Sequence, residues 1–221
     1  MLRAAVAFAD RDGVEALSMR RLAEDLRVVP MALYKHVADK EALLDGMVEV
    51  VVGEIGTPAP SGEWKRAVRD GVLAARRVLL RHRWAYAVLE SRKTPTPAVL
   101  DYLNAMIGLF RAGGFSADLC HHAMHALGSR VLGFTQELFD DSRGLDPATP
   151  PEVVRELARR YPHIAEIALG ASHDAGSVVG PGCDDQAEFE FALDVLLDGF
   201  ERLREREMSR GSRRAAPSRG G

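Results

Sequence analysis

The sequence predicts an all-α protein with a small N-terminal domain and a larger C-terminal helical domain. Apolar residues recur at spacings of three and four through most of the chain, and no segment alternates apolar and polar residues as a half-buried strand would. Glycine and proline interrupt this pattern at intervals and set the ends of the predicted helices. Hydrophobic residues make up 47% of the 221 positions, which is enough for a sizeable core.

Charge and composition exclude several classes of protein. The formal net charge of -3 means that any nucleic-acid-binding surface must be local. No apolar stretch is long enough to predict a membrane span, and the first residues lack the basic head and apolar run of a signal peptide. Cys120 and Cys183 have no metal-binding spacing, so we interpret them as reduced thiols of a cytoplasmic protein.

Four helices are predicted in the first 55 residues, and each has a recognisable end. Serine and aspartate accept hydrogen bonds from the first N–H groups of a helix, proline suits its first position, and glycine commonly follows its last. The predicted helices are 2–12 before Gly13, 19–25 after Ser18, 30–36 from Pro30, and 40–55 after Asp39.

Further helices are predicted after the proline- and glycine-rich stretch 56–62. They cover residues 63–82, 97–112, 116–140, 151–169 and 187–207. We predict one domain over residues 1–45 and a second over 46–207, so that helix 40–55 runs from one into the other. Residues 208–221 are basic and glycine-rich, which predicts a disordered tail that is either solvated or makes a weak nonspecific DNA contact.

Two of the long helices carry apolar residues at alternating steps of four and three, like a heptad seam. The seams either face the domain's own core or pair with the same helices of a second chain as a four-helix bundle. We favour the second interpretation. The predicted dimer interface comprises Met124, Leu127, Val131, Phe134, Leu138, Phe189, Leu193, Leu196 and Phe200.

Residues 19–36 have the pattern of a helix-turn-helix, in which Ala23 is small enough for the point where two helices cross. The apolar residues expected to be buried around it are Leu22, Leu26, Val28 and Leu33. Because the second helix is short and polar outside, its exposed face is predicted to enter a DNA major groove.

The surface of this motif is predicted to be basic. Residues 18–40 hold five lysines and arginines against three acidic residues. Lys40 begins a helix, whose positive end adds to the lysine charge at a phosphate. Tyr34 and His36 can donate hydrogen bonds to phosphate oxygens. These features favour double-stranded DNA as the partner.

The motif and its surroundings resemble the DNA-binding domain of the tetracycline-repressor family of transcription regulators. The matching segments are "LSMRRLA", "ALYKHV" and "DKEALL". More loosely, "FRAGGFSADLCHHAMHALGSRVLGF" and "FEFALDVLLDGFERL" resemble the ligand-binding, dimerising domain of the tetracycline-repressor subgroup. The resemblance implies a homodimer that binds a palindromic operator. It also implies that a small-molecule inducer moves helix 40–55 and changes the spacing of the two reading heads.

The resemblance also assigns roles to individual residues. It implies that Arg20 contacts a base and that Pro30, Met31 and Ala32 form the base-facing start of the recognition helix. It places Tyr34, Lys35 and His36 near the DNA and gives Lys40 a phosphate. The predicted DNA-binding residues are therefore Ser18, Arg20, Pro30, Met31, Ala32, Tyr34, Lys35, His36 and Lys40.

Three departures keep open the alternative of a dimerising adaptor protein that has lost its DNA affinity. Arg27 stands where the family usually has glycine, which predicts strain of about 1 kcal/mol in a left-handed turn. Val29 stands where a capping serine or threonine is usual. The chain also begins inside the first helix, so either the family's short arm is absent or the start codon lies upstream.

The sequence predicts either a ligand that differs from the family's magnesium-bound drug or no ligand at all. Leu89 stands at the position of the metal-binding histidine, and only Glu137 matches an acidic position of that site. The residues expected near a largely apolar ligand, or alternatively in the plain core, are Trp84, Tyr86, Leu89, Tyr102, Met106, Phe110, His125 and Glu137.

No cofactor, metal or enzymatic activity is predicted. His121 and His125 lie one helical turn apart, but no third ligand follows at helical spacing. The chain has no GxSxG, no Walker loop and no HExxH motif. A steep fall of affinity with salt would distinguish a DNA-binding protein from an enzyme or an adaptor.

Overall fold

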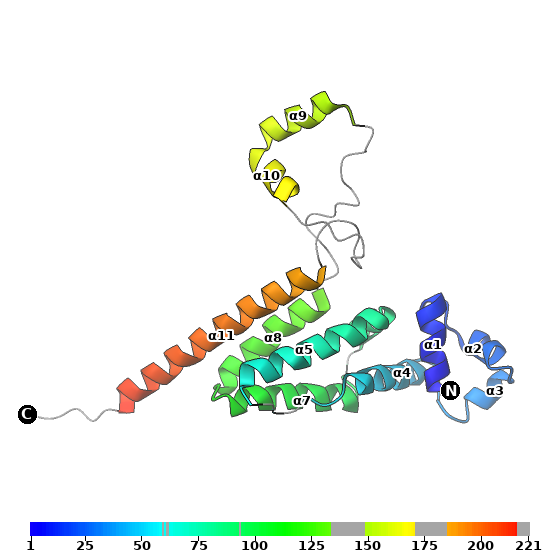
Figure 1. Cartoon of the computed structure of the whole chain (residues 1–221). Helices are drawn as coiled ribbons and strands as arrows, with labels where there is room; N and C mark the ends of the chain where they lie inside the picture. The colour runs from blue at the N-terminus through cyan, green and yellow to red at the C-terminus, as the bar shows by residue number, and fades with distance from the viewer. Residues whose placement is uncertain (59, 61, 93, 134–148, 171–184, 216–221) are drawn as a thin grey trace, which may run out of the picture.

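The computed structural model describes residues 1–58, 60, 62–92, 94–133, 149–170 and 185–215, and all of its regular elements are helices. At one end, α1 (Leu2–Asp12), α2 (Met19–Asp25) and α3 (Pro30–Leu33) pack into a small unit (Figure 1). From this unit α4 (Lys40–Ile55) runs into the second group of helices. The predicted all-α fold is confirmed over the described residues.

The second group lies side by side in an elongated bundle (Figure 1). It comprises α5 (Trp64–Arg81), α6 (Trp84–Ser91), α7 (Pro97–Ala112), α8 (Ala117–Gly133) and α11 (Asp185–Ala215). Two further helices, α9 (Pro151–Arg160) and α10 (Pro162–Gly170), contact each other and lie away from the bundle (Figure 1).

The predicted helices agree with the structure except at a few places. Helix α6 was not predicted, because only two residues separate it from α5 and neither is glycine or proline. The single helix predicted over 151–169 is two helices. The chain breaks at Tyr161 because the following Pro162 disfavours helical geometry in the residue before it.

The predicted disordered tail is wrong for residues 208–215, which continue α11 without a break. Arginine, methionine and alanine in this segment favour a helix, and residues 208–215 contain no proline that would interrupt it. Residues 216–221 lie outside the described part of the chain.

Side-chain caps position the N-terminal helices as predicted. The Ser18 hydroxyl accepts a hydrogen bond from the Arg21 N–H at 3.2 Å, and the Asp39 carboxylate accepts one from the Ala42 N–H at 2.8 Å. Each cap satisfies an N–H group that has no partner within its own helix.

The predicted burial is found for the side chains of Leu22, Ala23 and Leu33. Val28 was predicted to be buried and is instead exposed. The cause is the turn after α2, where Arg27 adopts a left-handed conformation with φ of 55°. The Val28 N–H bonds to the Ala23 carbonyl at 2.9 Å and the Arg27 N–H bonds to the Glu24 carbonyl at 3.1 Å, which is a Schellman arrangement. The turn directs the Val28 side chain away from the helix crossing.

Replacing Arg27 with glycine is expected to raise the free energy of unfolding by up to about 1 kcal/mol, because glycine adopts positive φ without strain. Urea denaturation followed by circular dichroism measures this change. The matched control is Arg77→Gly, an exposed position in the interior of α5, where glycine should lower stability by about 1 kcal/mol. A loss of stability in both variants would contradict the strain at residue 27.

A hydrophobic core formed by α5, α7, α8 and α11 joins α11 to the rest of the bundle. Four aromatic rings, those of Trp64, Phe110, Phe115 and Phe200, meet with centroids between 4.6 and 6.1 Å apart. At the edge of this core, Arg69 of α5 contacts Glu190 and Asp194 of α11, each at 2.7 Å. Hydrogen bonds from Gln186 and Arg69 lower the pKa of Glu190.

The predicted dimer seam lies mainly in the protomer's own core. Leu127, Phe189, Leu193 and Phe200 are buried within the single chain, so assigning them to a dimer interface was wrong. Met124, Val131 and Leu196 are half-buried at the margin of the same core, while Phe134 and Leu138 lie outside the described residues. The alternative interpretation, in which the seams face the domain's own core, holds for the four buried residues.

Candidate DNA-binding surface and ligand cavity

The helix-turn-helix presents the predicted DNA-binding residues on its exposed side. Arg20 lies on α2, with 84% of its side chain exposed. Pro30, Met31 and Ala32 form the first turn of α3. The remaining predicted residues are exposed and lie after α3, in a turn or at the start of α4; they are Tyr34, Lys35, His36 and Lys40.

The third helix is shorter than predicted, because α3 ends at Leu33. The following residues remain in a hydrogen-bonded turn, in which the N–H groups of His36 and Val37 bond to the Leu33 carbonyl at 2.9 and 3.2 Å. The turn therefore holds Tyr34, Lys35 and His36 beside α3. Ser18 is half-buried and caps α2, so its position supports the helix that carries Arg20.

Arg20 contacts Glu24 of the same helix, with 3.0 Å between Nε and Oε1. Both side chains are largely exposed, and exposed pairs of this kind contribute little to stability. The guanidinium can therefore exchange this contact for a base or a phosphate at little cost. Its five N–H donors suit the two acceptors that guanine presents in the major groove.

The turn after α2 and the first turn of α3 carry a set of exposed apolar residues, Val28, Val29 and Met31, which we call the apolar patch. Val29 is 68% exposed and Met31 69% exposed. The sequence analysis included Met31 but missed the two valines, one of which was placed in the core. The signal that could have found them is Arg27, because a left-handed residue at this position turns the next residues outward.

Contacts between side chains of the two helix groups join the unit formed by α1, α2 and α3, which we call the reading unit, to the bundle. His82, at the end of α5, is buried, and its Nδ1 lies 2.8 Å from Asp10 of α1. Its Nε2 lies 3.2 Å from Glu54 of α4. The indole N–H of Trp84 donates to Asp10 at 2.7 Å. Trp84 was predicted near the ligand, but it packs in the core at this junction.

The other end of α4 is held in the same way. Arg92 follows α6 and contacts Glu41 at 2.6 Å and Asp45 at 3.1 Å. The N–H of Ala98 donates to Glu49 at 2.8 Å, which joins α7 to the middle of α4. Helix α4 therefore packs on α1 of the reading unit and on the bundle at the same time.

A cavity of about 690 Å³ lies among α4, α5, α6, α7 and α8, and most of its lining is apolar. Five residues predicted near the ligand line it, namely Tyr86, Leu89, Tyr102, Met106 and His125. Phe110 does not line it, because its ring is fully buried in the aromatic core. Glu137 lies outside the described residues.

Val52 and Ile55 line the cavity from the last turns of α4 and were not predicted from the sequence. Their apolar character gives no signal, because other apolar residues of α4, such as Val48 and Val51, are buried in the core. The Tyr102 hydroxyl donates to the Gly71 carbonyl at 3.3 Å, and burial raises the pKa of Tyr102. A molecule in this cavity would thus touch the helix that carries the reading unit.

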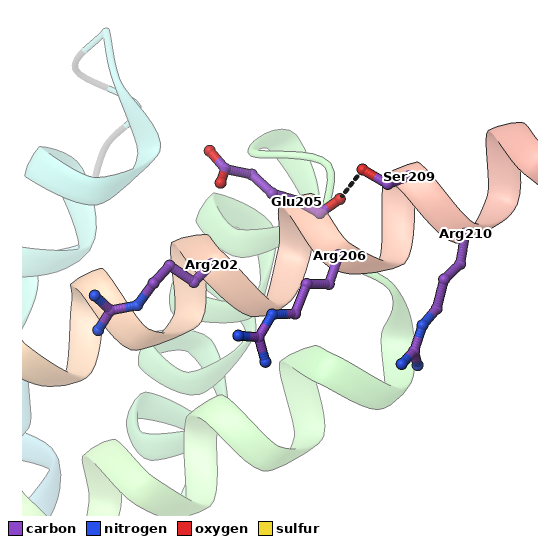
Figure 2. Close-up of a pocket in the computed structure, with 5 residues that line it drawn as sticks. All are labelled: Arg202, Glu205, Arg206, Ser209 and Arg210. Carbon is purple, nitrogen blue, oxygen red and sulfur yellow. Dashed lines mark hydrogen bonds between the residues drawn. The ribbon is translucent and has the colours of Figure 1, made fainter.

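A second hollow lies on the exposed side of α11 (Figure 2). Arg202, Arg206 and Arg210 recur at steps of four and extend on one side of the helix, while the Glu205 side chain points the other way. The end of α11 that carries them lies far from α3 (Figure 1). This surface therefore does not extend the DNA-binding face of the same protomer.

Two further observations concern metal-binding side chains and membrane-spanning helices, neither of which was predicted. The rings of His121 and His125 meet with centroids 4.6 Å apart, but the described residues contain no group of three metal-binding side chains. Among the same residues, no helix combines the length and apolar character needed to cross a lipid bilayer.

Comparison with known proteins gives consistent matches over most of the chain. The family model "Tetracyclin repressor-like, C-terminal domain" matches residues 57–204, and the model "Bacterial regulatory proteins, tetR family" matches residues 1–47. An HTH-type transcriptional regulator of Saccharopolyspora erythraea is 31% identical, with 90% of this chain and 82% of the relative aligned.

Two further relatives resemble the chain over most of its length. The class G tetracycline repressor protein of Vibrio anguillarum is 30% identical over 87% of each chain. Among solved structures, ActR of Streptomyces coelicolor in complex with actinorhodin has a TM-score of 0.67 and 26% identity. That match covers 91% of this chain and 94% of ActR.

Proposed function

The chain belongs to the tetR family of bacterial regulatory proteins, and from this premise we propose how it acts. It is a ligand-responsive, DNA-binding transcriptional regulator rather than an enzyme. In our proposal it is a repressor that binds a palindromic operator as a homodimer. A small, largely apolar molecule enters the cavity of each protomer and releases the protein from the DNA.

The observation that carries this proposal is the position of α4. It packs against α1 of the reading unit, and its last turns contribute Val52 and Ile55 to the cavity wall. A ligand that pushes on these side chains shifts a rigid helix between two packed groups. The displacement at the DNA end changes the distance between the two reading units of a dimer.

The exposed face of α11 supports the homodimer. Phe191 is 67% exposed and Val195 lies exposed one turn further along. Gly199, in the next turn, faces open space in the single chain, since an added Cβ would meet no atom within 4 Å, and its lack of a side chain allows a second helix to approach closely. Large apolar side chains in an exposed row commonly mark a protein interface. This row replaces the buried residues that the sequence analysis had assigned to the dimer.

The proposed function is tested by mixing the purified protein with a pool of random DNA duplexes and sequencing those that it binds. We expect a two-fold palindrome whose half-site centres lie about one helical turn apart. Titration of the selected duplex at several salt concentrations should show a steep fall of affinity, because phosphate contacts release counterions. A folded, dimeric protein that enriches no sequence would support the alternative of an adaptor without DNA affinity.

The apolar patch predicts how part of the operator is read. Val28, Val29 and Met31 offer no hydrogen bond to a base edge, whereas the thymine methyl group is an apolar feature of the major groove. Replacing one thymine by uracil in each selected half-site should therefore weaken binding roughly tenfold, since each buried methyl contributes about 0.8 kcal/mol.

The control for this prediction is uracil at thymines outside the half-sites, which should leave the affinity unchanged. A fluorescence anisotropy titration measures all duplexes under the same salt conditions. If every half-site thymine tolerates uracil without loss, the patch does not read methyl groups and Arg20 alone supplies the direct contacts.

A further inference from the structure

The cavity among α4–α8 has an uneven distribution of charge. Among its described lining residues there is one carboxylate, that of Glu90, and there is no lysine or arginine. The other groups that can ionise are Tyr86, Tyr102 and His125. Tyr102 adds no negative charge at neutral pH, because burial raises its pKa. Glu90 therefore dominates the electrostatic potential of the site.

Glu90 lies where a ligand can reach it. It is the last residue but one of α6 and is exposed although it lines the cavity, which places it at the opening rather than at the floor. Among the described residues it makes no ion pair, unlike Glu41, Asp45 and Glu54 on the neighbouring α4. Its charge is thus available to a molecule in the cavity.

The rest of the lining selects the shape of that molecule. Tyr86 lies one turn before Glu90 on the same helix, and Tyr102 lines the wall formed by α7. Aromatic faces attract both flat rings and cations. The remaining lining is mostly aliphatic, and a volume of about 690 Å³ is in the range of sites that hold one mid-sized organic molecule.

We propose that this cavity takes an aromatic ligand with a positively charged or amine-bearing group, which binds beside Glu90. The inference rests on the proposed function, since it assumes that this cavity is the regulatory site. A cation at the mouth pairs with Glu90 while its rings fill the apolar interior. An anion of the same size meets the carboxylate with no lysine or arginine in the described lining to offset the repulsion, and apolar walls strengthen both effects.

Two dyes with the same xanthene ring system test this proposal in the absence of DNA. Rhodamine 123 is a cation and fluorescein is an anion at pH 8, and fluorescence anisotropy measures the binding of each to the full chain. We expect rhodamine 123 to bind at least tenfold more tightly than fluorescein. In Glu90→Gln the preference should fall below threefold, because the variant keeps the shape of the side chain and removes its charge.

The matched control is Glu205→Gln, which removes one exposed carboxylate from α11, far from the cavity lining. This variant should keep the tenfold preference of the native chain. The proposal is overturned by equal affinity for the two dyes, by tighter binding of fluorescein, by no binding of either dye, or by a preference that survives in Glu90→Gln.

The same dyes distinguish this inference from the proposed function. Rhodamine 123 is added to the complex of the protein with its selected operator, and the fraction of bound DNA is measured. If the dye binds through Glu90 and the DNA stays bound, the ligand class stands and ligand-induced release fails. If the selection yields no operator but the dye preference is found, the DNA-binding proposal fails while the inference about the cavity holds.

Discussion

Replacing Arg20 with alanine is expected to weaken operator binding on the order of 100-fold while leaving the free energy of unfolding nearly unchanged. A bidentate contact of arginine with guanine discriminates by about 1–3 kcal/mol, and a symmetric dimer loses it at both half-sites. The side chain is 84% exposed and contacts only Glu24 of its own helix, so its removal leaves the core intact.

Arg66→Ala is a closely matched control for this variant. Arg66 is 79% exposed and lies 3.8 Å from Asp70, which is also four residues further along a helix. It lies on α5, outside the reading unit, and its loss should not change operator affinity. Anisotropy titrations and urea denaturation of both variants are the required measurements. Native affinity in Arg20→Ala would show that the DNA-facing side of the motif has been assigned incorrectly.

Replacing Phe191 with aspartate is expected to convert the dimer to a folded monomer and to abolish operator binding at concentrations where the native chain is bound. Phe191 is 67% exposed in the single chain, so a charge there is tolerated by the protomer. In the proposed interface the same charge would be buried against its symmetry-related copy without a partner. Sedimentation equilibrium measures the loss of the dimer, and circular dichroism should show native helix content.

Phe189→Asp provides the contrast two residues earlier on the same helix. Phe189 is fully buried, and the guanidinium of Arg76 lies 4.1 Å from the centre of its ring. A carboxylate in this core should lower the free energy of unfolding by more than about 3 kcal/mol, because the ring's packing is lost and a charge is desolvated. If Phe189→Asp folds normally and Phe191→Asp unfolds, the buried and exposed faces of α11 have been assigned the wrong way round.

Much of the N-terminal unit could be predicted because its signals are local. Ser18, Asp39 and Pro30 act within one turn of themselves, and each begins the helix that was expected. Gly13 ends α1 with φ of 84°, a conformation that glycine adopts without strain. The left-handed conformation expected at Arg27 is found, with φ of 55°, because the end of α2 requires it locally.

The face of α11 that stays exposed could not be predicted in this way. Phe189, Leu193 and Phe200 are spaced as a helical stripe, but Phe191 and Val195 on the opposite side are spaced equally well. Periodicity identifies which residues share a face of a helix and does not identify what covers that face. Only the packing of α11 against α5 and α8 shows that the first stripe is internal and the second is exposed.

The ligand cavity was partly predictable. Tyr86, Tyr102 and Met106 were expected near it from the family resemblance, and they line it. Trp84 and Phe110 were not separable from them in the sequence, because a large apolar residue suits a core and a cavity wall equally. Their positions follow from long-range contacts, namely the bond from Trp84 to Asp10 and the packing of Phe110 on Trp64.

The sequence by itself determined the helical fold, the two groups of helices and the basic, exposed side of the helix-turn-helix. These depend on periodicity, caps and turns, which act over a few residues. The tertiary structure alone decided which stripe of α11 is buried, that Val28 and Val29 are exposed in the turn before α3, and that α4 ends in the cavity wall. Each of these depends on contacts between residues far apart in the chain, and local patterns do not encode such contacts.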